Sequence, residues 1–270
     1  MSLKPTGDLA ESLLDCLERN STDQADELMS VPAAIYTDPD QGSAEIDLIF
    51  KRLPLMLALT CETPKRGDYK ALDVVGLPVL LSRDKAGTMC AFLNAWSHRW
   101  TPVVAEGIGQ CPQFRFTWPS HGWTYGMDGK RFAVADRSKL GELDNSKHGL
   151  KELPCEERHG MIFASLTSGA SLDLDGYYGD LLHDNAQFEL QTCMFVGRSE
   201  HRGPNWKLIY ANFFESYHFA TQHSKTVVPS FIPNLCVYEE SGSPCGSVSP
   251  YARSPNCAMS HALSGRIRRV

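Results

Sequence analysis

The sequence lacks several features that would assign it to a special class of protein. Its nine cysteines include no pair with C-x-x-C spacing, so disulfides are not expected to be its framework. No window approaches the roughly 18 uninterrupted apolar residues of a membrane span, and acids interrupt the apolar N-terminal stretch, so no signal peptide is expected. No Lys/Arg block precedes Arg266, which disfavours nucleic acid and anionic membranes as partners. These absences favour a cytosolic protein with reduced thiols.

The composition is that of a folded chain. The 270 residues are 42% hydrophobic and 10% aromatic, and 26 basic against 32 acidic side chains give a formal net charge of −6. Because apolar residues are spread along the whole length, the chain can bury the core of one or two domains. With 21% charged residues, the composition does not resemble that of a disordered protein.

The apolar pattern changes its period along the chain. Helical spacing predicts a helix over residues 7–20 and a second, short helix over 44–53. Short apolar runs separated by turn signals predict an antiparallel β domain between residues 68 and 166. After a polar segment, a strand-like run at 193–196 precedes an aromatic helix expected over 205–223. Helices at either end therefore bracket a β domain.

Two loops of this expected β domain each carry a histidine. They read Asn-Ala-Trp-Ser-His-Arg, beginning at Asn94, and Trp-Pro-Ser-His-Gly-Trp, beginning at Trp118. The pair resembles the Rieske signature, N-x-C-x-H-R and C-P-x-H-G-W, in which two thiolates hold one iron of a [2Fe–2S] cluster and two imidazoles hold the other. The resemblance assigns His98 and His121 to the imidazole positions, and Trp96 with Trp118 to the cysteine positions.

The two tryptophans change what these loops can bind. An indole has no lone pair in the ring plane, so Trp96 and Trp118 cannot replace thiolates. We therefore expect a degenerate Rieske domain in which the usual cluster does not assemble. Cys90 and Cys111, six and seven residues before the two tryptophans, are either shifted ligands or small buried hydrophobes. The two loop histidines are either metal ligands or structural side chains.

A second motif lies in the expected aromatic helix. It opens with Asn-Trp-Lys at 205–207, continues as Asn-Phe-Phe-Glu-Ser-Tyr-His from Asn212, and ends at His223. It resembles the mononuclear iron motif of Rieske-type ring-hydroxylating oxygenase α subunits. By that resemblance His218 and His223 are two ligands of a facial triad on Fe(II), with open positions for O2 and substrate. Glu215 is then the bridging acid to the Rieske histidine of a neighbouring subunit.

The spacing of the two histidines carries a geometric condition. His218 and His223 lie roughly 140° apart around an ideal helix, so their convergence on one ion requires a bulge or a helix end between them. Glu215, three residues before His218, shares a helix face with it. Two alternatives stay open: an aromatic helix that buries its histidines in a core, or a zinc site made by the two histidines and Glu215.

The resemblance implies an α+β fold with the β domain inserted into an oxygenase catalytic domain. Residues 1–60 are then an N-terminal helical segment that packs on the catalytic part, 61–166 an antiparallel Rieske-like β domain, and 167–270 a partial mononuclear-iron domain. The family's third iron ligand lies well over a hundred residues beyond the histidine pair, and no residue here can be assigned to it. From about residue 243 the composition shifts toward Ser, Pro, Cys and Arg. We expect a truncated catalytic domain and hypothesise a frameshift near Gly242.

The family's reaction implies O2-dependent hydroxylation or demethylation of an aromatic or quaternary-amine substrate. Electrons come from an NAD(P)H reductase, sometimes through a ferredoxin, and the α subunits assemble as trimers. We expect this activity to be impaired, because both cluster cysteines and the third iron ligand are missing. The alternative is a non-catalytic pseudoenzyme that assembles with intact α subunits.

Overall fold

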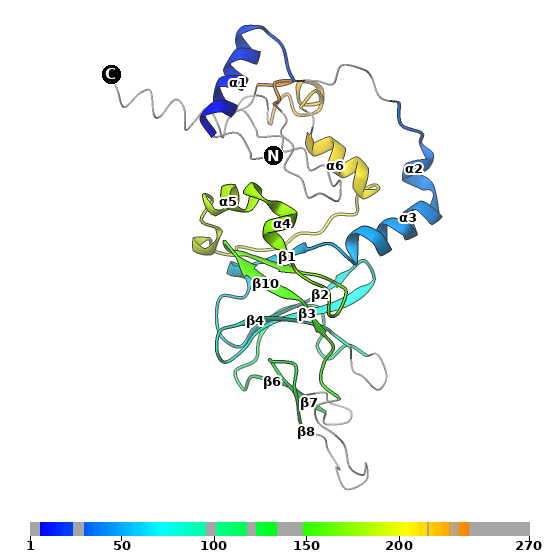
Figure 1. Ribbon diagram of the computed structural model, residues 1–270, viewed down its shortest axis with the longest axis vertical. Helices are drawn as coiled ribbons and strands as arrows, with labels where there is room; N and C mark the ends of the chain where they lie inside the picture. Colours follow the sequence, from blue (N-terminus) through cyan, green and yellow to red (C-terminus); the bar gives the residue numbers. More distant parts are fainter. Residues whose placement is uncertain are drawn as a thin grey trace, which may run out of the picture. The chain divides into compact units, whose positions relative to one another are not determined.

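The chain divides into two compact units (Figure 1). The β unit comprises Ser43–Leu174 and Leu182–Arg198, and the helical unit comprises Met1–Gly42, Asp175–Leu181 and Ser199–Val270. None of the helices within the described residues combines the length and the apolarity that crossing a membrane requires. The computed structural model describes residues 6–23, 30–95, 101–117, 123–133, 148–214, 216–226, 228 and 232–237.

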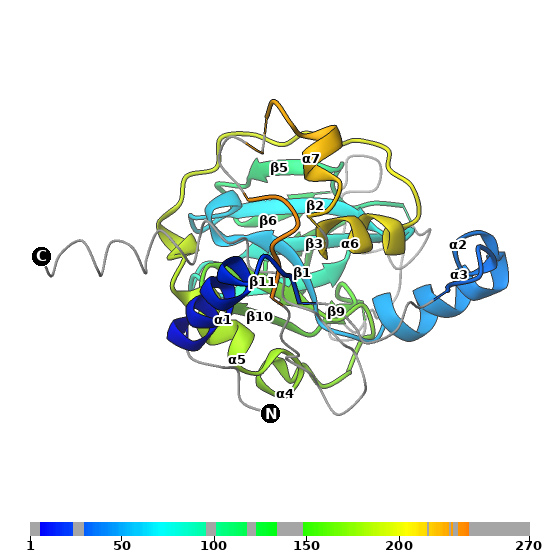
Figure 2. The same cartoon turned by 90° about the horizontal axis from the view of Figure 1, so that it is seen from above.

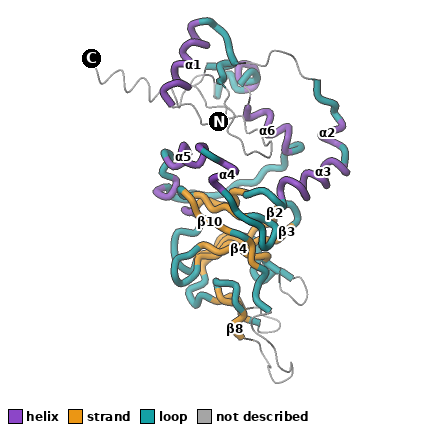
Figure 3. Tube along the Cα trace, in the orientation of Figure 1, coloured by secondary structure: helices purple, strands orange, loops and turns teal. Residues whose placement is uncertain are grey.

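Antiparallel strands make up the β unit (Figure 3). They are β1 Leu55–Leu59, β2 Asp68–Val74, β3 Leu77–Arg83, β4 Met89–Leu93, β5 Gly107–Gln110, β6 Arg115–Thr117, β7 Thr124–Gly126, β8 Arg131–Ala133, β9 Glu152–Leu153, β10 Cys155–Arg158 and β11 Met161–Ala164. The described strands form a five-stranded sheet of order β5-β2-β3-β4-β9 and two three-stranded sheets, β1-β11-β10 and β6-β7-β8.

The five-stranded sheet is apolar on both faces. In β3, Val79 and Leu81 pack into a cluster with residues of β1 and β11, whereas Leu80 between them packs into a second cluster with Phe116 and Tyr125 of the β6-β7-β8 sheet. Because successive side chains of a strand point to opposite faces, this division places the five-stranded sheet between the other two. The continuous apolar run of β3 follows from burial on both sides.

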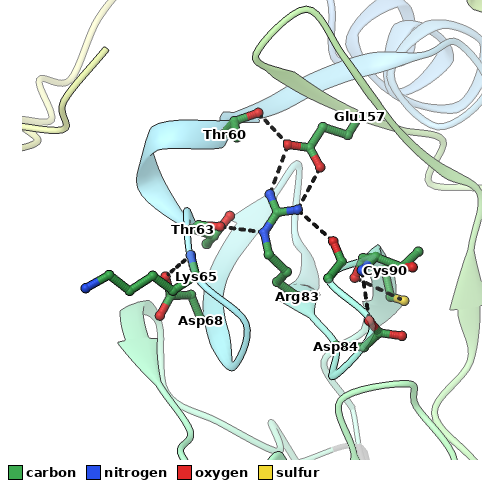
Figure 4. A network of polar contacts seen from close by, with 10 residues as sticks. Thr60, Thr63, Lys65, Asp68, Arg83, Asp84, Cys90 and Glu157 are labelled. Atoms are coloured by element: carbon green, nitrogen blue, oxygen red, sulfur yellow. Dashed lines mark hydrogen bonds and ion pairs between the residues drawn. The ribbon is translucent and has the colours of Figure 1, made fainter. Parts of the chain in front are cut away.

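Short turns and buried charges fix the edges of these sheets. Strands β2 and β3 are joined by Val75 and Gly76, whose φ angles are +49° and +83°, the left-handed conformation of a tight two-residue hairpin turn. Figure 4 shows the Arg83 guanidinium between the Thr63 carbonyl, 2.7 Å from Nε, and the Glu157 carboxylate, 2.8 Å from one terminal nitrogen. These contacts tie the end of β3 to β10.

Helices dominate the other unit. Leu13 and Cys16 of α1 pack against Leu235 and Val237, which belong to a segment far along the chain, and Figure 2 shows this segment running beside α1. Three of the helices span a point at which the chain passes from one unit to the other. The α-helices are α1 Thr6–Glu18, α2 Ala34–Thr37, α3 Pro39–Glu45, α4 Leu174–Tyr178, α5 Asp180–Ala186, α6 Trp206–Phe214 and α7 Phe219–Gln222, and single turns of other helix types are η1 Ile46–Phe50, η2 Thr60–Glu62 and η5 Leu190–Thr192.

The structure confirms the α+β class and corrects three element predictions. The helix expected over 7–20 is confirmed as α1, but the second helix begins earlier, at Pro39, and ends in the π-helical turn η1. The strand expected at 193–196 is wrong: Met194 and Val196 are exposed and the segment pairs with no described strand. The single helix expected over 205–223 is divided into α6 and α7.

Candidate functional site

The second motif begins with a helix cap. Asn205 precedes α6, and its Oδ1 accepts a hydrogen bond of 3.0 Å from the Lys207 backbone N–H, while its Nδ2 donates to the Tyr36 carbonyl at 2.9 Å. The first contact satisfies one of the free N–H groups at the helix start. The second ties that start to α2. An asparagine at this position therefore fixes where the aromatic helix begins.

The helix ends before the two histidines. After α6, which stops at Phe214, a new helical turn, α7, starts at Phe219 and ends at Gln222. His218 directly precedes this turn and His223 directly follows it, with φ −116° and ψ +22° outside the helical region. The Gln222 N–H donates to the His218 carbonyl at 2.8 Å, and the His223 N–H donates to the Phe219 carbonyl at 3.0 Å. Each histidine thus occupies one end of a single turn.

With His218 at the start of α7 and His223 just beyond its end, the two imidazole rings lie close together. Their centroids lie 5.4 Å apart at an interplanar angle of 68°, as the geometric condition on the spacing requires. Two imidazoles bound to one ion through nitrogens about 2.1 Å from the metal have centroids roughly 4.5–5.5 Å apart. The Phe219 ring contacts both, at 4.8 Å from the His218 ring and 5.8 Å from the His223 ring. The pair therefore has the spacing that a shared ion needs.

Burial distinguishes the two histidines. His218 is 9% exposed, and His223 is only partly buried. Within the described ranges, no group of three or more His, Cys, Asp or Glu side chains lies close enough to hold a metal ion. The bridging acid predicted from the motif, Glu215, lies outside the described residues. The part of the site that the structure describes is thus two imidazoles and the Phe219 ring.

The first histidine loop of the β unit is closed at its base by an asparagine. Asn94 is 2% exposed, and its Oδ1 accepts from the N–H groups of Val103 at 2.9 Å and Val104 at 3.1 Å, while its Nδ2 donates to the Val104 carbonyl at 2.8 Å. One side chain thereby joins the two ends of the connection. Trp96 and His98, within that connection, lie outside the described residues.

The second histidine loop rises from paired strands. Thr117 of β6 pairs with Thr124 of β7, and their hydroxyl oxygens lie 3.2 Å apart. Trp123, beside this pair, packs into the same apolar cluster as Phe116 and Tyr125. Trp118 and His121, in the connection between the strands, lie outside the described residues. Protein side chains therefore pack and hydrogen-bond the described bases of both loops.

The cysteines proposed as shifted ligands are engaged elsewhere. The Cys111 Sγ lies 2.7 Å from the Arg115 carbonyl, and both Cys90 and Cys111 pack against the apolar cluster of Trp123. Burial, with smaller contributions from nearby Asp84 and Glu152, raises the pKa of Cys90 to about 11. The packing of both side chains against this cluster favours the interpretation of the pair as small hydrophobes.

One contact of the site carried no signal in the sequence. The side chain of Cys236 meets that of Ser216, two residues before His218, with 3.1 Å between Sγ and Oγ. The Phe219 ring, which the motif does not specify, directly follows His218 in the chain. A contact between residues 20 positions apart has no local pattern that would reveal it.

Two family models match the chain. The model described as "Rieske [2Fe-2S] domain" matches residues 54–147 and includes both histidine loops. The model described as "Ring hydroxylating alpha subunit (catalytic domain)" matches residues 180–259, and so includes His218 and His223 and continues past residue 243.

Relatives of known function support the same assignment. The chain is 28% identical over 216 residues to a glycine betaine monooxygenase oxygenase subunit of Chromohalobacter salexigens, covering 80% of this chain and 46% of the relative. It is 35% identical over 204 residues to the N,N-dimethyl phenylurea N-demethylase subunit alpha of Sphingobium sp., covering 72% of this chain and 43% of the relative. The chain thus spans about half the length of these curated relatives.

A solved structure shares the fold. The quaternary ammonium Rieske monooxygenase CntA, in complex with an inhibitor, superposes with a TM-score of 0.74 at 21% identity, over 90% of this chain and 63% of that one. Both domain matches, the relatives and the fold agree with the two motifs. The chain belongs to the family of Rieske-type ring-hydroxylating oxygenase α subunits.

Proposed function

We propose that this chain holds one Fe(II) ion between His218 and His223 and takes part in O2-dependent hydroxylation or demethylation. The observation that carries the proposal is the approach of the two imidazole rings to 5.4 Å from opposite ends of α7. Two imidazoles with a carboxylate are the donor set of non-heme Fe(II) oxygenases. The zinc site with Glu215 as a third ligand is the competing metal assignment.

The proposed substrate carries an N-methyl group. One relative is a glycine betaine monooxygenase subunit and another an N,N-dimethyl phenylurea N-demethylase subunit. Both names refer to compounds with methyl groups on nitrogen, although one is a small quaternary amine and the other an aryl urea. We therefore place quaternary amines and N-methylated aromatics before unmethylated aromatics as candidates.

The roles of the protein groups follow from their surroundings. Iron, when bound, supplies the activation of O2 beside the substrate. His218, buried, and His223, partly exposed, would hold the ion as neutral imidazoles, and Phe219 contacts both rings and restricts their rotation. Glu215 would orient His218 and link the site to a neighbouring subunit. The third ligand would come from solvent or from a residue outside the described ranges.

We propose further that the chain builds no [2Fe–2S] cluster of its own. Trp96 and Trp118 stand where the family's thiolates are expected, and an indole cannot supply a thiolate. Cys90 and Cys111 are packed against the apolar cluster at the base of the loops. Of the two predicted assemblies, a homotrimer of this chain would have no cluster, so electrons from a reductase or ferredoxin would reach the chain through an intact α subunit in a heterotrimer.

The same tryptophans favour a second function. A chain without its own electron entry can serve as a non-catalytic pseudoenzyme that completes an oligomer of intact α subunits.

All seven described cysteines are free thiols, which supports a reducing compartment such as the cytosol as the place where either function is carried out.

Metal and sulfide analysis tests the metal assignments. For protein purified without oxygen from iron-replete cells, we expect about one iron per chain, lost in His218→Gln and His223→Gln, and none of the roughly two acid-labile sulfides of a [2Fe–2S] centre. His148→Gln, a histidine beside Trp123 in the β unit, is the matched control and should leave the iron content unchanged. Labile sulfide near two per chain would overturn the cluster proposal, and retained zinc the iron proposal.

Mixing separates the two functions. Demethylation of glycine betaine by the chain with reductase is expected only after an intact α subunit is added, and the activity of the mixture should exceed that of the α subunit alone only if His218 is present. If His218→Gln supports the mixture as well as the unchanged chain does, the chain is a non-catalytic partner. Activity without any intact subunit would contradict both functions as proposed.

A further inference from the structure

A segment remote in sequence is fastened to the end of α1. Thr22 Oγ1 accepts a hydrogen bond of 3.1 Å from the Cys236 N–H and donates one of 3.3 Å to the Cys236 carbonyl, which also accepts from the Asp23 N–H at 3.0 Å. Leu235 and Val237, on either side of Cys236, are buried against Leu13 and Cys16. Backbone and side-chain contacts therefore hold residue 236 firmly in the helical unit.

The same segment reaches the turn that carries the first histidine. The Cys236 Sγ lies 3.1 Å from the Ser216 Oγ, and the Asn234 N–H donates to the Ser216 carbonyl at 3.4 Å. That carbonyl also accepts from the Phe219 N–H at 3.1 Å, at the start of α7. Ser216 thus connects the anchored segment to the helical turn whose two ends are His218 and His223.

The side chains of this connection are buried, so a change at Cys236 is expected to affect Ser216 and, through it, His218. Ser216 and Cys236 are each 7% exposed, and His218 is 9% exposed. In the described part of the chain, Cys236 is the hydrogen-bond partner of the Ser216 hydroxyl. A buried hydroxyl that loses its partner bears the cost of its desolvation, so the turn would move to find another partner. Because His218 is two residues away, its ring would move with the turn.

We propose that Cys236 is a positioning residue for the histidine pair, acting through Ser216 to hold the His218 ring at its distance from the His223 ring. The inference rests on the proposed function for its consequence, the binding of a metal ion, but the positioning itself is a property of the metal-free chain. Side chains that orient metal ligands commonly change affinity by about 10–100-fold when they are removed.

Cys236→Ala in the full chain tests the positioning without metal. The Cε1–Hε1 resonances of the histidines, assigned with His218→Gln and His223→Gln, should show a displaced or broadened His218 signal. Cys155→Ala is the control, because it removes a partly buried thiol from β10 in the other unit and leaves the segment around Cys236 unchanged. Cys236→Ser, which keeps a donor and acceptor near Ser216, should restore most of the signal.

Cobalt(II) titration adds the consequence for binding. With Co²⁺ as the probe, the visible absorption should show about 10-fold weaker binding for Cys236→Ala than for Cys155→Ala, whose affinity should match that of the unchanged chain. An unchanged His218 resonance in a folded Cys236→Ala chain overturns the inference whatever the metal does. A displaced resonance in a chain that never binds Co²⁺ supports the positioning and instead contradicts the proposed function.

Discussion

The β unit and the helical unit differ in how completely their apolar side chains are covered. Both faces of the five-stranded sheet are packed, and Phe163 of β11 is 2% exposed. In α6, by contrast, Trp206, Leu208 and Ile209 are all exposed by more than a third, and Phe213 is 78% exposed. Among the described contacts, the cap at Asn205 fixes the start of α6.

The units also differ in what remains of their metal ligands. The β unit, where tryptophans replace both expected thiolates, has a full core at the base of its histidine loops. The helical unit, where the histidine pair converges, has a small apolar cluster of α1 and the segment around Leu235. The comparison separates packing from ligand content: the better-packed unit is the one for which we propose that the metal site has lost its thiolates.

Truncation of one phenylalanine in each unit tests the comparison most directly. Phe163→Ala removes a buried ring and should lower the free energy of unfolding of the β unit by about 4 kcal/mol. Phe213→Ala should cost less than about 0.5 kcal/mol, because most of that ring is already in water. Peptide-resolved hydrogen exchange in urea reports each unit separately. A cost above about 1.5 kcal/mol for Phe213→Ala would show that α6 is covered, and the comparison would fail.

Charge pairs give the next largest contrast. In the β unit, Lys70 Nζ lies 2.6 Å from a Glu62 carboxylate oxygen, with side-chain exposures of 7% and 9%. Glu62→Ala removes the charged partner of a buried ammonium, whose Nζ keeps its hydrogen bond of 3.1 Å to the Leu57 carbonyl, and should cost about 3 kcal/mol. Asp15→Ala removes the partner of Arg19 from an exposed pair on α1 and should cost less than about 1 kcal/mol. The same urea experiment checks both; equal costs would contradict the assigned difference in burial.

Two glycines sharpen the account of packing within the β unit. Gly129 and Gly169 have nearly the same φ, +73° and +74°, but a Cβ at Gly129 would meet the Phe92 ring, whereas nothing lies within 4 Å of a Cβ at Gly169. Gly169→Ala should cost about 1 kcal/mol through backbone strain alone. Gly129→Ala should cost about 2 kcal/mol more through overpacking. Similar melting temperatures for the two variants would mean that the core beneath the histidine loops is loose.

Elements that are determined by neighbouring residues could be predicted from the sequence. Elements that depend on contacts with residues far along the chain could not. The uninterrupted run of β3 reflects burial on both of its faces, and the helical spacing of α1 reflects one buried face, so each pattern sufficed. At 193–196 the same kind of run belongs to an exposed segment, because apolar residues form a strand only where a partner strand exists. The left-handed turn at Val75 could not be predicted from the sequence either, since a β-branched residue is not typical of a turn.

The candidate site shows the same division. The resemblance to a family motif identified the histidine pair, and the spacing of its two members predicted the helix end between them. The contact between Ser216 and Cys236 does not, because it depends on how the segment around Leu235 returns to α1. The clamp made by Asn94 is intermediate: the residue was noticed in the motif, but its three hydrogen bonds to Val103 and Val104 required the structure.

The smallest expected effect is a pH dependence confined to the β unit. Burial raises the pKa of Glu157, but hydrogen bonds from Arg83 and Thr60 and the charge of Arg83 outweigh it and hold this pKa below its ordinary value of 4.5. A carboxylate whose folded pKa is depressed stabilises the fold fully above its unfolded pKa and loses that contribution as pH falls through the folded value. The urea concentration at the unfolding midpoint of the β unit should therefore decrease as the pH is lowered below about 4.5. The decrease should be less steep in Glu157→Gln. Asp15→Asn in the helical unit is the control, and should leave the β-unit curve unchanged. Parallel curves for Glu157→Gln and the unchanged chain would mean that the Arg83 pair contributes nothing to the pH response of the better-packed unit.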